Sequence, residues 1–196
     1  MKRTILQAAF AALSLGIGGS AMAGEAADSG MAMNHKTAKT DQQLIENAMK
    51  AAPAAVAAKA KIVAMTADGG LRTLRERSNG YTCMPDGGAA PGPDAMCADG
   101  PAMKWLAAYI AHKTPEPNAV GFIYMLAGGT DSSNTDPFAA KPASGSDWIR
   151  TGPHVMIVGA DASFYQAYPG APNPDVSVPY VMWPGTPYQH LMAPSQ

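Results

Sequence analysis

Two stretches of the chain carry apolar residues at the 3.6-residue spacing of an α-helix. The first follows Thr40-Asp41-Gln42-Gln43, which fits a capping box, and predicts a helix over about 40–51 that ends before Pro53. The alanine-rich residues 54–60 add a further turn or two. The second follows Asp99-Gly100-Pro101, a capping residue and a proline, and predicts a helix over about 101–113. The spacing therefore predicts two main helices.

Most of the remaining apolar residues form short runs of strand length between turn sequences. Residues 61–65 and 71–75 flank Asp68-Gly69-Gly70, which predicts a β-hairpin. Residues 119–127 are continuously apolar, as is typical of a central strand. Further strands are predicted at 81–83 and 154–158, and a closing hairpin at 178–183 and 188–192. Together these segments predict a single α+β domain over 40–196, with an antiparallel or mixed sheet of five to seven strands.

Glycine and proline are unusually frequent in this chain. They number 20 and 17, and these 37 of 196 residues are roughly a fifth of the chain. The ordinary background is about 12%. The composition excludes a coiled coil and a helix bundle, and it predicts long Gly/Pro-rich loops between the strands. Only 15% of the residues are charged and the formal net charge is −1, so no basic track for nucleic acid is expected. The polar segment 128–147 is long for a loop, and such loops are often functional.

The first 23 residues have the pattern of a secretory signal peptide. Lys2 and Arg3 form a cationic start, residues 5–17 are mostly apolar, and Ala21-Met22-Ala23 is a small-x-small cleavage site. We expect cleavage after Ala23, a disordered leader over 24–39, and a mature protein that is periplasmic or secreted. No later apolar run reaches the roughly 20 residues that span a bilayer, so no membrane span is expected.

Cys83 and Cys97 are the only two cysteines of the chain. An even number of cysteines in an exported protein predicts a disulfide bond. The bond would close a loop of 15 residues, counted from Cys83 to Cys97, that is rich in glycine and proline. A redox-active pair would favour C-x-x-C spacing, so we interpret this pair as structural.

Five stretches of the sequence, taken together, resemble an uncharacterised family of small exported bacterial proteins. The stretches are ENAMKAAP from residue 46, SNGYTCMPD from 78, GGTDSSNTDPF from 128, TGPHVM from 151 and PYVMWPGTPYQHLM from 179. The resemblance covers most of residues 41–194. It implies one exported domain and assigns no chemistry to it.

A repeated His-x-Met triplet is the most suggestive chemical pattern. His154 and Met156, like His190 and Met192, are two residues apart on a predicted strand and therefore share one face of it. If the two strands were neighbours, two imidazoles and two thioethers would converge, and these ligands suit copper(I). Ordinary core packing explains the same pattern and is the commoner arrangement. Apart from a copper ion at these residues, no cofactor is expected. A third grouping, MAMNH at 31–35, falls in the predicted leader.

The acidic loop 131–136 allows a calcium site or a network of turns. Asp131, Ser133 and Thr135 occupy the first alternate positions of an EF-hand-like loop. The sixth position is Asp136 instead of glycine, and the twelfth is Pro142 instead of glutamate. Side chains that cap their own backbone are therefore favoured.

Two function classes remain open from these residues. The leading hypothesis is an exported, non-enzymatic binding or accessory protein for a small molecule or a soft metal ion, with Trp183 and Tyr188 as partly exposed ligand contacts. The alternative is a cofactor-independent periplasmic hydrolase. It would use His154 or His190 as base, Asp131 or Asp136 to orient that base, and a serine or threonine nucleophile. None of the common catalytic motifs accompanies these residues.

Overall fold

The structure is a computed structural model, and it describes residues 39–195. The predicted signal peptide at 1–23 and the leader, except for its last residue, lie outside the described residues. In chain order the elements are α1 (Asp41–Met49), α2 (Ala54–Ala57), β1 (Lys61–Met65), β2 (Leu71–Arg75), β3 (Tyr81–Met84), β4 (Met96–Asp99), α3 (Gly100–Ile110), β5 (Gly121–Met125), β6 (Gly129–Asp131), β7 (Ile149–Thr151), β8 (His154–Val158), α4 (Ala162–Tyr165), β9 (Tyr180–Met182) and β10 (His190–Pro194).

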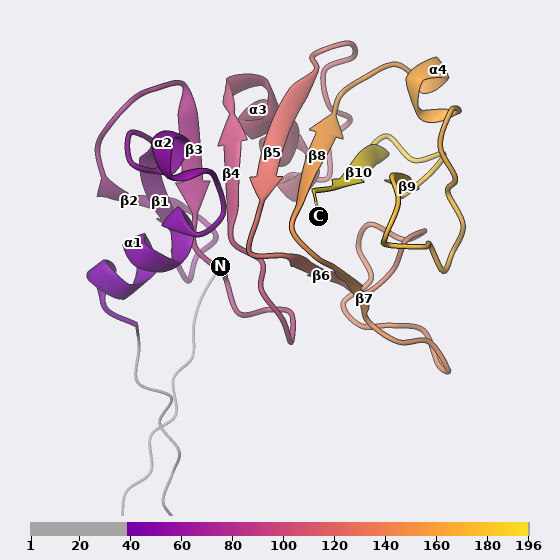
Figure 1. Cartoon of the computed structure of the whole chain (residues 1–196), viewed down its shortest axis with the longest axis horizontal. Helices are drawn as coiled ribbons and strands as arrows, with labels where there is room; N and C mark the ends of the chain where they lie inside the picture. The colour runs from indigo at the N-terminus through magenta and orange to yellow at the C-terminus, as the bar shows by residue number, and fades with distance from the viewer. Residues whose placement is uncertain (1–38, 196) are drawn as a thin grey trace, which may run out of the picture. The chain divides into compact units, whose positions relative to one another are not determined.

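Eight strands form one mixed sheet in the order β2-β1-β3-β4-β5-β8-β10-β9 (Figure 1). β1 and β3 run parallel, whereas every other neighbouring pair is antiparallel. The sheet is open, with β2 and β9 at its two edges, and β6 and β7 form a separate ribbon. The predicted α+β class is confirmed, but the prediction of five to seven strands is wrong.

The main sheet has one strand more than the upper limit of the prediction, because the sequence of β4 shows no strand pattern of its own. Its four residues, Met96 to Asp99, directly follow a loop rich in glycine and proline. Its pairing partners define it: Cys97 lies opposite Cys83 of β3, and Ala98 lies opposite Ile123 of β5. Because β4 is defined by pairing with distant segments, its own sequence shows no alternation of apolar and polar residues that would predict a strand.

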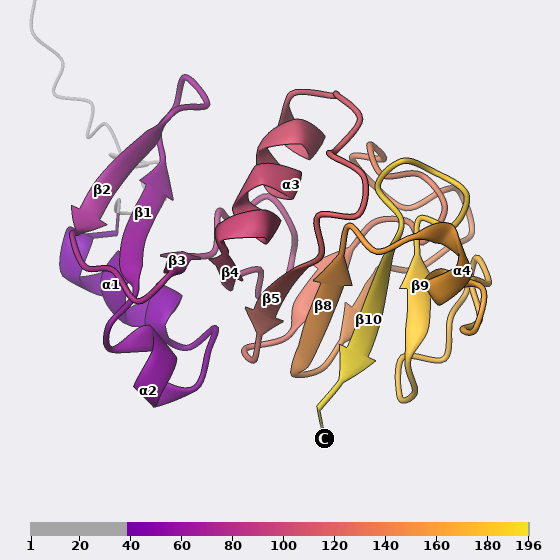
Figure 2. The ribbon, with the colours of Figure 1, turned by 90° about the horizontal axis from the view of Figure 1, so that it is seen from above.

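Helices cover both faces of the sheet (Figure 2). α3 packs over β4 and β5, where Ala102 and Trp105 join a core that includes Ala98 and Ile123. α1 and α2 pack on the opposite face, against a second core that includes the buried disulfide. None of the described helices is long and apolar enough to cross a membrane.

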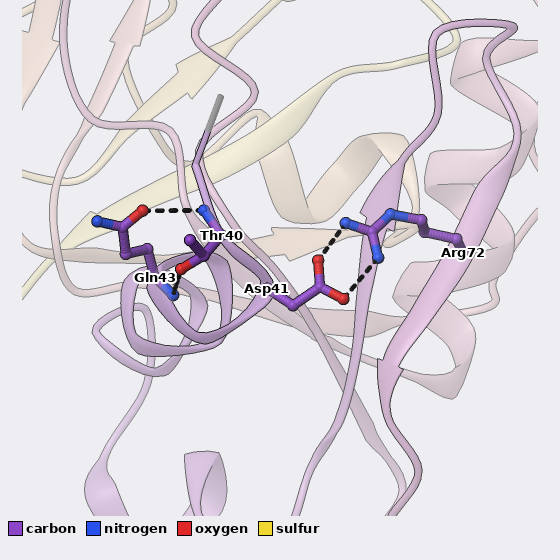
Figure 3. A network of polar contacts seen from close by, with 4 residues as sticks. All are labelled: Thr40, Asp41, Gln43 and Arg72. Carbon is purple, nitrogen blue, oxygen red and sulfur yellow. Dashed lines mark hydrogen bonds and ion pairs between the residues drawn. The ribbon is translucent and has the colours of Figure 1, made fainter. Parts of the chain in front are cut away.

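The start of α1 confirms the predicted capping box (Figure 3). The Gln43 backbone N–H donates to the Thr40 hydroxyl at 3.3 Å, and the Thr40 N–H donates to the Gln43 side-chain oxygen at 2.9 Å. Next to this cap, Arg72 of β2 donates two hydrogen bonds to the Asp41 carboxylate, at 2.6 and 3.0 Å. These contacts tie α1 to the edge strand.

The predicted disulfide between Cys83 and Cys97 is also confirmed. The two residues are direct cross-strand partners on β3 and β4, and both are fully buried. The disulfide therefore fixes both ends of the loop between these strands, which carries Asp94.

Candidate functional site

Methionine and histidine side chains gather on the sheet face that α3 covers. Met192 of β10 lies directly opposite Met156 of β8, and His190 lies directly opposite Met182 of β9. Because alternate residues of a strand share a face, His190, Met192, Met156 and Met182 all point to this side of the sheet. All four are at most 8% exposed. We call these four residues the thioether floor.

A cavity of about 300 Å³ lies over the thioether floor. Met125 of β5 completes its base, and α3 contributes Trp105, Leu106 and Tyr109 to its wall. The rest of the wall comes from the loop before β4, with Asp94, and from the segment 128–148, with Asp131, Asp136 and Trp148. The cavity therefore brings together residues from seven separate parts of the chain.

The wall segment 128–148 is anchored to β9 and the residue after it. The Trp183 indole donates to the Ser133 carbonyl at 2.9 Å, and the Trp183 backbone N–H donates to the Asn134 carbonyl at 2.8 Å. The Asn134 side chain in turn donates to the carbonyls of Ala171 and Val181. The segment predicted as one polar loop therefore begins as a strand, β6, and is held over the sheet.

The two aromatic residues predicted as partly exposed ligand contacts are buried instead. Trp183 is 8% exposed and Tyr188 is 6% exposed. Trp183 does line the cavity, and its φ of 54° places its backbone in the left-handed region, which non-glycine residues seldom adopt. Its ring stacks on Tyr109 with 5.1 Å between ring centroids. Hydrogen bonding and packing together hold this unusual conformation.

Two of the carboxyl groups on the cavity wall are strongly perturbed. Burial, with smaller contributions from the charges of Asp131 and Asp86, raises the pKa of Asp94 to about 7. Burial also raises the pKa of Asp131 to about 6. Within the described part of the chain, no residue donates a hydrogen bond to either carboxyl, and the cavity lining contains no lysine or arginine. Among residues 39–195, the ionised carboxylates therefore have no hydrogen-bond or ion-pair partner.

The two histidines are buried, neutral and separately placed. The Nδ1–H of His154 donates to the Gly152 carbonyl at 2.7 Å, and that of His190 donates to the Tyr188 carbonyl at 2.9 Å. Both Nε2 atoms are buried and have no partner among residues 39–195. Burial lowers both pKa values, that of His190 to about 4, where the charge of His154 contributes a little.

The sequence predicts that the two His-x-Met triplets converge only if their strands are neighbours, and β8 and β10 are neighbours. The antiparallel register, however, places Met156 against Met192 and the two histidines at opposite ends, since His154 lies opposite Pro194. Along β10, His190 and the residue opposite His154 are four residue steps apart, which corresponds to about 13 Å at roughly 3.3 Å per residue. The His154 ring packs instead against Gly129, where an added Cβ would lie 3.0 Å from its Cε1 atom. His154 therefore lies on the same sheet face as Met156 but is not among the residues that line the cavity.

The base and orienting residue predicted for a hydrolase do not meet in the structure. Among the described residues, neither His154 nor His190 forms a hydrogen bond with Asp131, Asp136 or any hydroxyl group. Each ring is oriented by a backbone carbonyl instead. The hydrolase thus gains no support from the geometry.

The oxygen atoms of the loop 131–136 largely cap their own backbone. The Ser133 hydroxyl accepts hydrogen bonds from the N–H groups of Thr135 and Asp136, at 3.1 and 2.9 Å. The Asp136 carboxylate accepts one from the Phe138 N–H. Over the described range, no group of three or more His, Cys, Asp or Glu residues is placed to hold a metal ion. The geometry is that of successive turns.

Comparison of this chain with protein-family models, with curated proteins and with solved structures found no match. The site must therefore be interpreted from its own residues. Sequence reasoning missed Asp94 and Met182, because neither residue belongs to a motif. Only the pairing of β9 with β10 brings Met182 opposite His190.

Proposed function

We propose that this protein binds a small cation in the cavity above the thioether floor, and that binding is its function. The observation that carries the proposal is the charge of the cavity lining. It holds the carboxyl groups of Asp94, Asp131 and Asp136, and it contains no lysine or arginine. A cation would supply the partner that the two perturbed carboxyl groups lack.

The aromatic residues of the lining favour the same class of ligand. Trp105, Trp148 and Trp183 all border the cavity, and they are the only tryptophans of the chain. Aromatic faces attract cations, and the attraction is stronger where water is excluded. A pocket with an apolar interior and a few converging polar groups is the usual form of a small-ligand site.

The same three tryptophans provide the assay. We would titrate the chain with choline, with its uncharged isostere 3,3-dimethyl-1-butanol and with Ag(I), following intrinsic fluorescence and the heat of binding. The proposal expects at least one of the two cations to bind. Affinity for that cation should be lower in Asp94→Asn and in Asp131→Asn, because each variant removes a negative charge from the wall.

Glu116→Gln is the matched control, since Glu116 is exposed and lies outside the cavity lining. It should bind like the unmodified chain. If neither cation binds, or if both aspartate variants bind the cation as well as the control does, the proposal is wrong. It is equally wrong if the uncharged isostere is the only ligand that binds.

A further inference from the structure

His190 has a methionine of the thioether floor on its own strand and on each of the two neighbouring strands. Met182 is its direct cross-strand neighbour on β9, and Met192 follows two residues later on the same face of β10. Met156 is the diagonal neighbour on β8, because it lies directly opposite Met192. Directly opposite residues have Cβ atoms about 5 Å apart, and diagonal ones remain within reach of long side chains. Methionine is flexible enough to turn its sulfur toward a shared point.

His190 is already in the form that a metal ligand requires. Its Nδ1–H is engaged with the Tyr188 carbonyl, so the free lone pair is on Nε2. That atom is buried without a partner in the described chain, although the residue lines the cavity. A histidine that ligates a metal commonly donates its other N–H to a backbone carbonyl in this way. A buried, unsatisfied nitrogen is costly, and a bound ion would satisfy it.

The surroundings of His190 keep water away from this atom. The Trp183 ring lies edge-on to the imidazole with 4.9 Å between centroids, and the Trp105 ring lies likewise at 5.4 Å. Neither tryptophan is more than 8% exposed. Uncharged sulfur and nitrogen ligands in a dry site suit a soft ion of low charge, whereas Ca²⁺ and Mg²⁺ favour oxygen ligands.

We propose that His190, Met156, Met182 and Met192 bind one Cu(I) ion at the bottom of the cavity. This inference rests on the proposed cation-binding function and names its ligand. The chain contains no free thiol, because its only two cysteines form the disulfide. Thioether and imidazole are therefore the soft ligands available, and Asp94 and Asp131 provide negative charge along the path to them.

Ag(I) is the probe for the first test, because it has the same charge and soft character as Cu(I) without its redox chemistry. The chain from residue 24 onward, with its disulfide intact, should bind one Ag(I) per molecule at the floor. Met182→Leu/Met192→Leu removes two sulfur atoms at nearly constant volume and should weaken this binding by about tenfold or more. Met103→Leu is the matched control, since Met103 packs against the same core but does not line the cavity. It should bind as the unmodified chain does.

The sequence near residues 31–35 offers a competing set of soft ligands, so a second variant is needed. Met31→Leu/Met33→Leu/His35→Gln should retain the binding. If this variant loses all Ag(I) binding while the floor variant retains it, the inference is wrong. Circular dichroism shows whether each variant is folded.

X-ray absorption of the unmodified chain loaded with Cu(I) tests the same site without any substitution. The inference expects sulfur neighbours together with one nitrogen, and a shell of only oxygen and nitrogen would overturn it. The choline titration separates the two proposals. Binding of choline without binding of Ag(I) overturns the Cu(I) site and leaves the cation pocket standing, whereas absence of both overturns both.

Discussion

Replacing Asp94 by asparagine should stabilise the fold while it weakens binding. The carboxyl group of Asp94 borders the cavity and has no hydrogen-bond donor among the described residues. Burial raises its pKa from 3.8 to about 7. Asparagine has nearly the same shape and carries no charge at any pH. The substitution therefore removes the charge and leaves the packing in place.

The sign and size of the effect follow from the pKa of Asp94. The folded protein holds this proton more tightly than the unfolded chain, so stability falls as pH rises from about 4 to about 7 and is then constant. At about 1.36 kcal/mol per pKa unit, a rise from 3.8 to about 7 corresponds to about 4 kcal/mol. Asp94 is only partly buried, and screening by solvent reduces this to about 2 kcal/mol.

Urea denaturation at several pH values, followed by tryptophan fluorescence, measures this difference. At pH 8 the free energy of unfolding of Asp94→Asn should exceed that of the unmodified chain by about 2 kcal/mol. Near pH 4 the two should be almost equal. Glu116→Gln, at an exposed position, should show no such pH-dependent gain. Parallel pH profiles for Asp94→Asn and the unmodified chain would refute the reasoning.

Three further predictions concern stability alone. Thr40→Ala removes the cap of α1 and should lower the free energy of unfolding in urea by about 1 kcal/mol, and no change would mean that the cap contributes nothing. Gly121→Ala places a Cβ 2.3 Å from the backbone nitrogen of Ala102, so α3 must shift. This should lower the free energy of unfolding by about 1–3 kcal/mol, and an unchanged midpoint of thermal unfolding would contradict the close contact. Cys83→Ala/Cys97→Ala frees a 15-residue loop and should cost about 3 kcal/mol in urea, a loss that reduction of the unmodified chain should reproduce.

Sequence reasoning succeeded where the signal is local. The hairpin of β1 and β2 matches the predicted ranges, because Asp68-Gly69-Gly70 favours the turn and the strands flank it directly. β8 matches for a similar reason, since its apolar run has clear ends. The first main helix begins as predicted because its capping box, Thr40 with Gln43, is a local signal that needs no tertiary contact.

The candidate site could be predicted only in part, because its geometry depends on strand pairing. The triplet spacing correctly placed His190 and Met192 on one face. It could not reveal that the antiparallel register would put His154 and His190 at opposite ends of the paired strands, or that β9 would bring in Met182. Asp94 acquires its raised pKa only when the loop before β4 folds over the sheet. No local pattern encodes any of these contacts.

The open sheet leaves two edges that could recruit strands from other molecules and start aggregation. The chain protects them differently. β9 has only three residues, with Pro179 before it and Pro184 shortly after it, so a partner strand would find little backbone to pair with. β2 is longer, but its two arginines tie it to the helical layer: Arg72 donates to the Asp41 carboxylate, and Arg75 donates to the Ala57 and Ala60 carbonyls. Charged side chains on an edge strand also disfavour pairing with another strand. The protein can therefore bury the apolar face of an unclosed sheet and still resist association edge to edge.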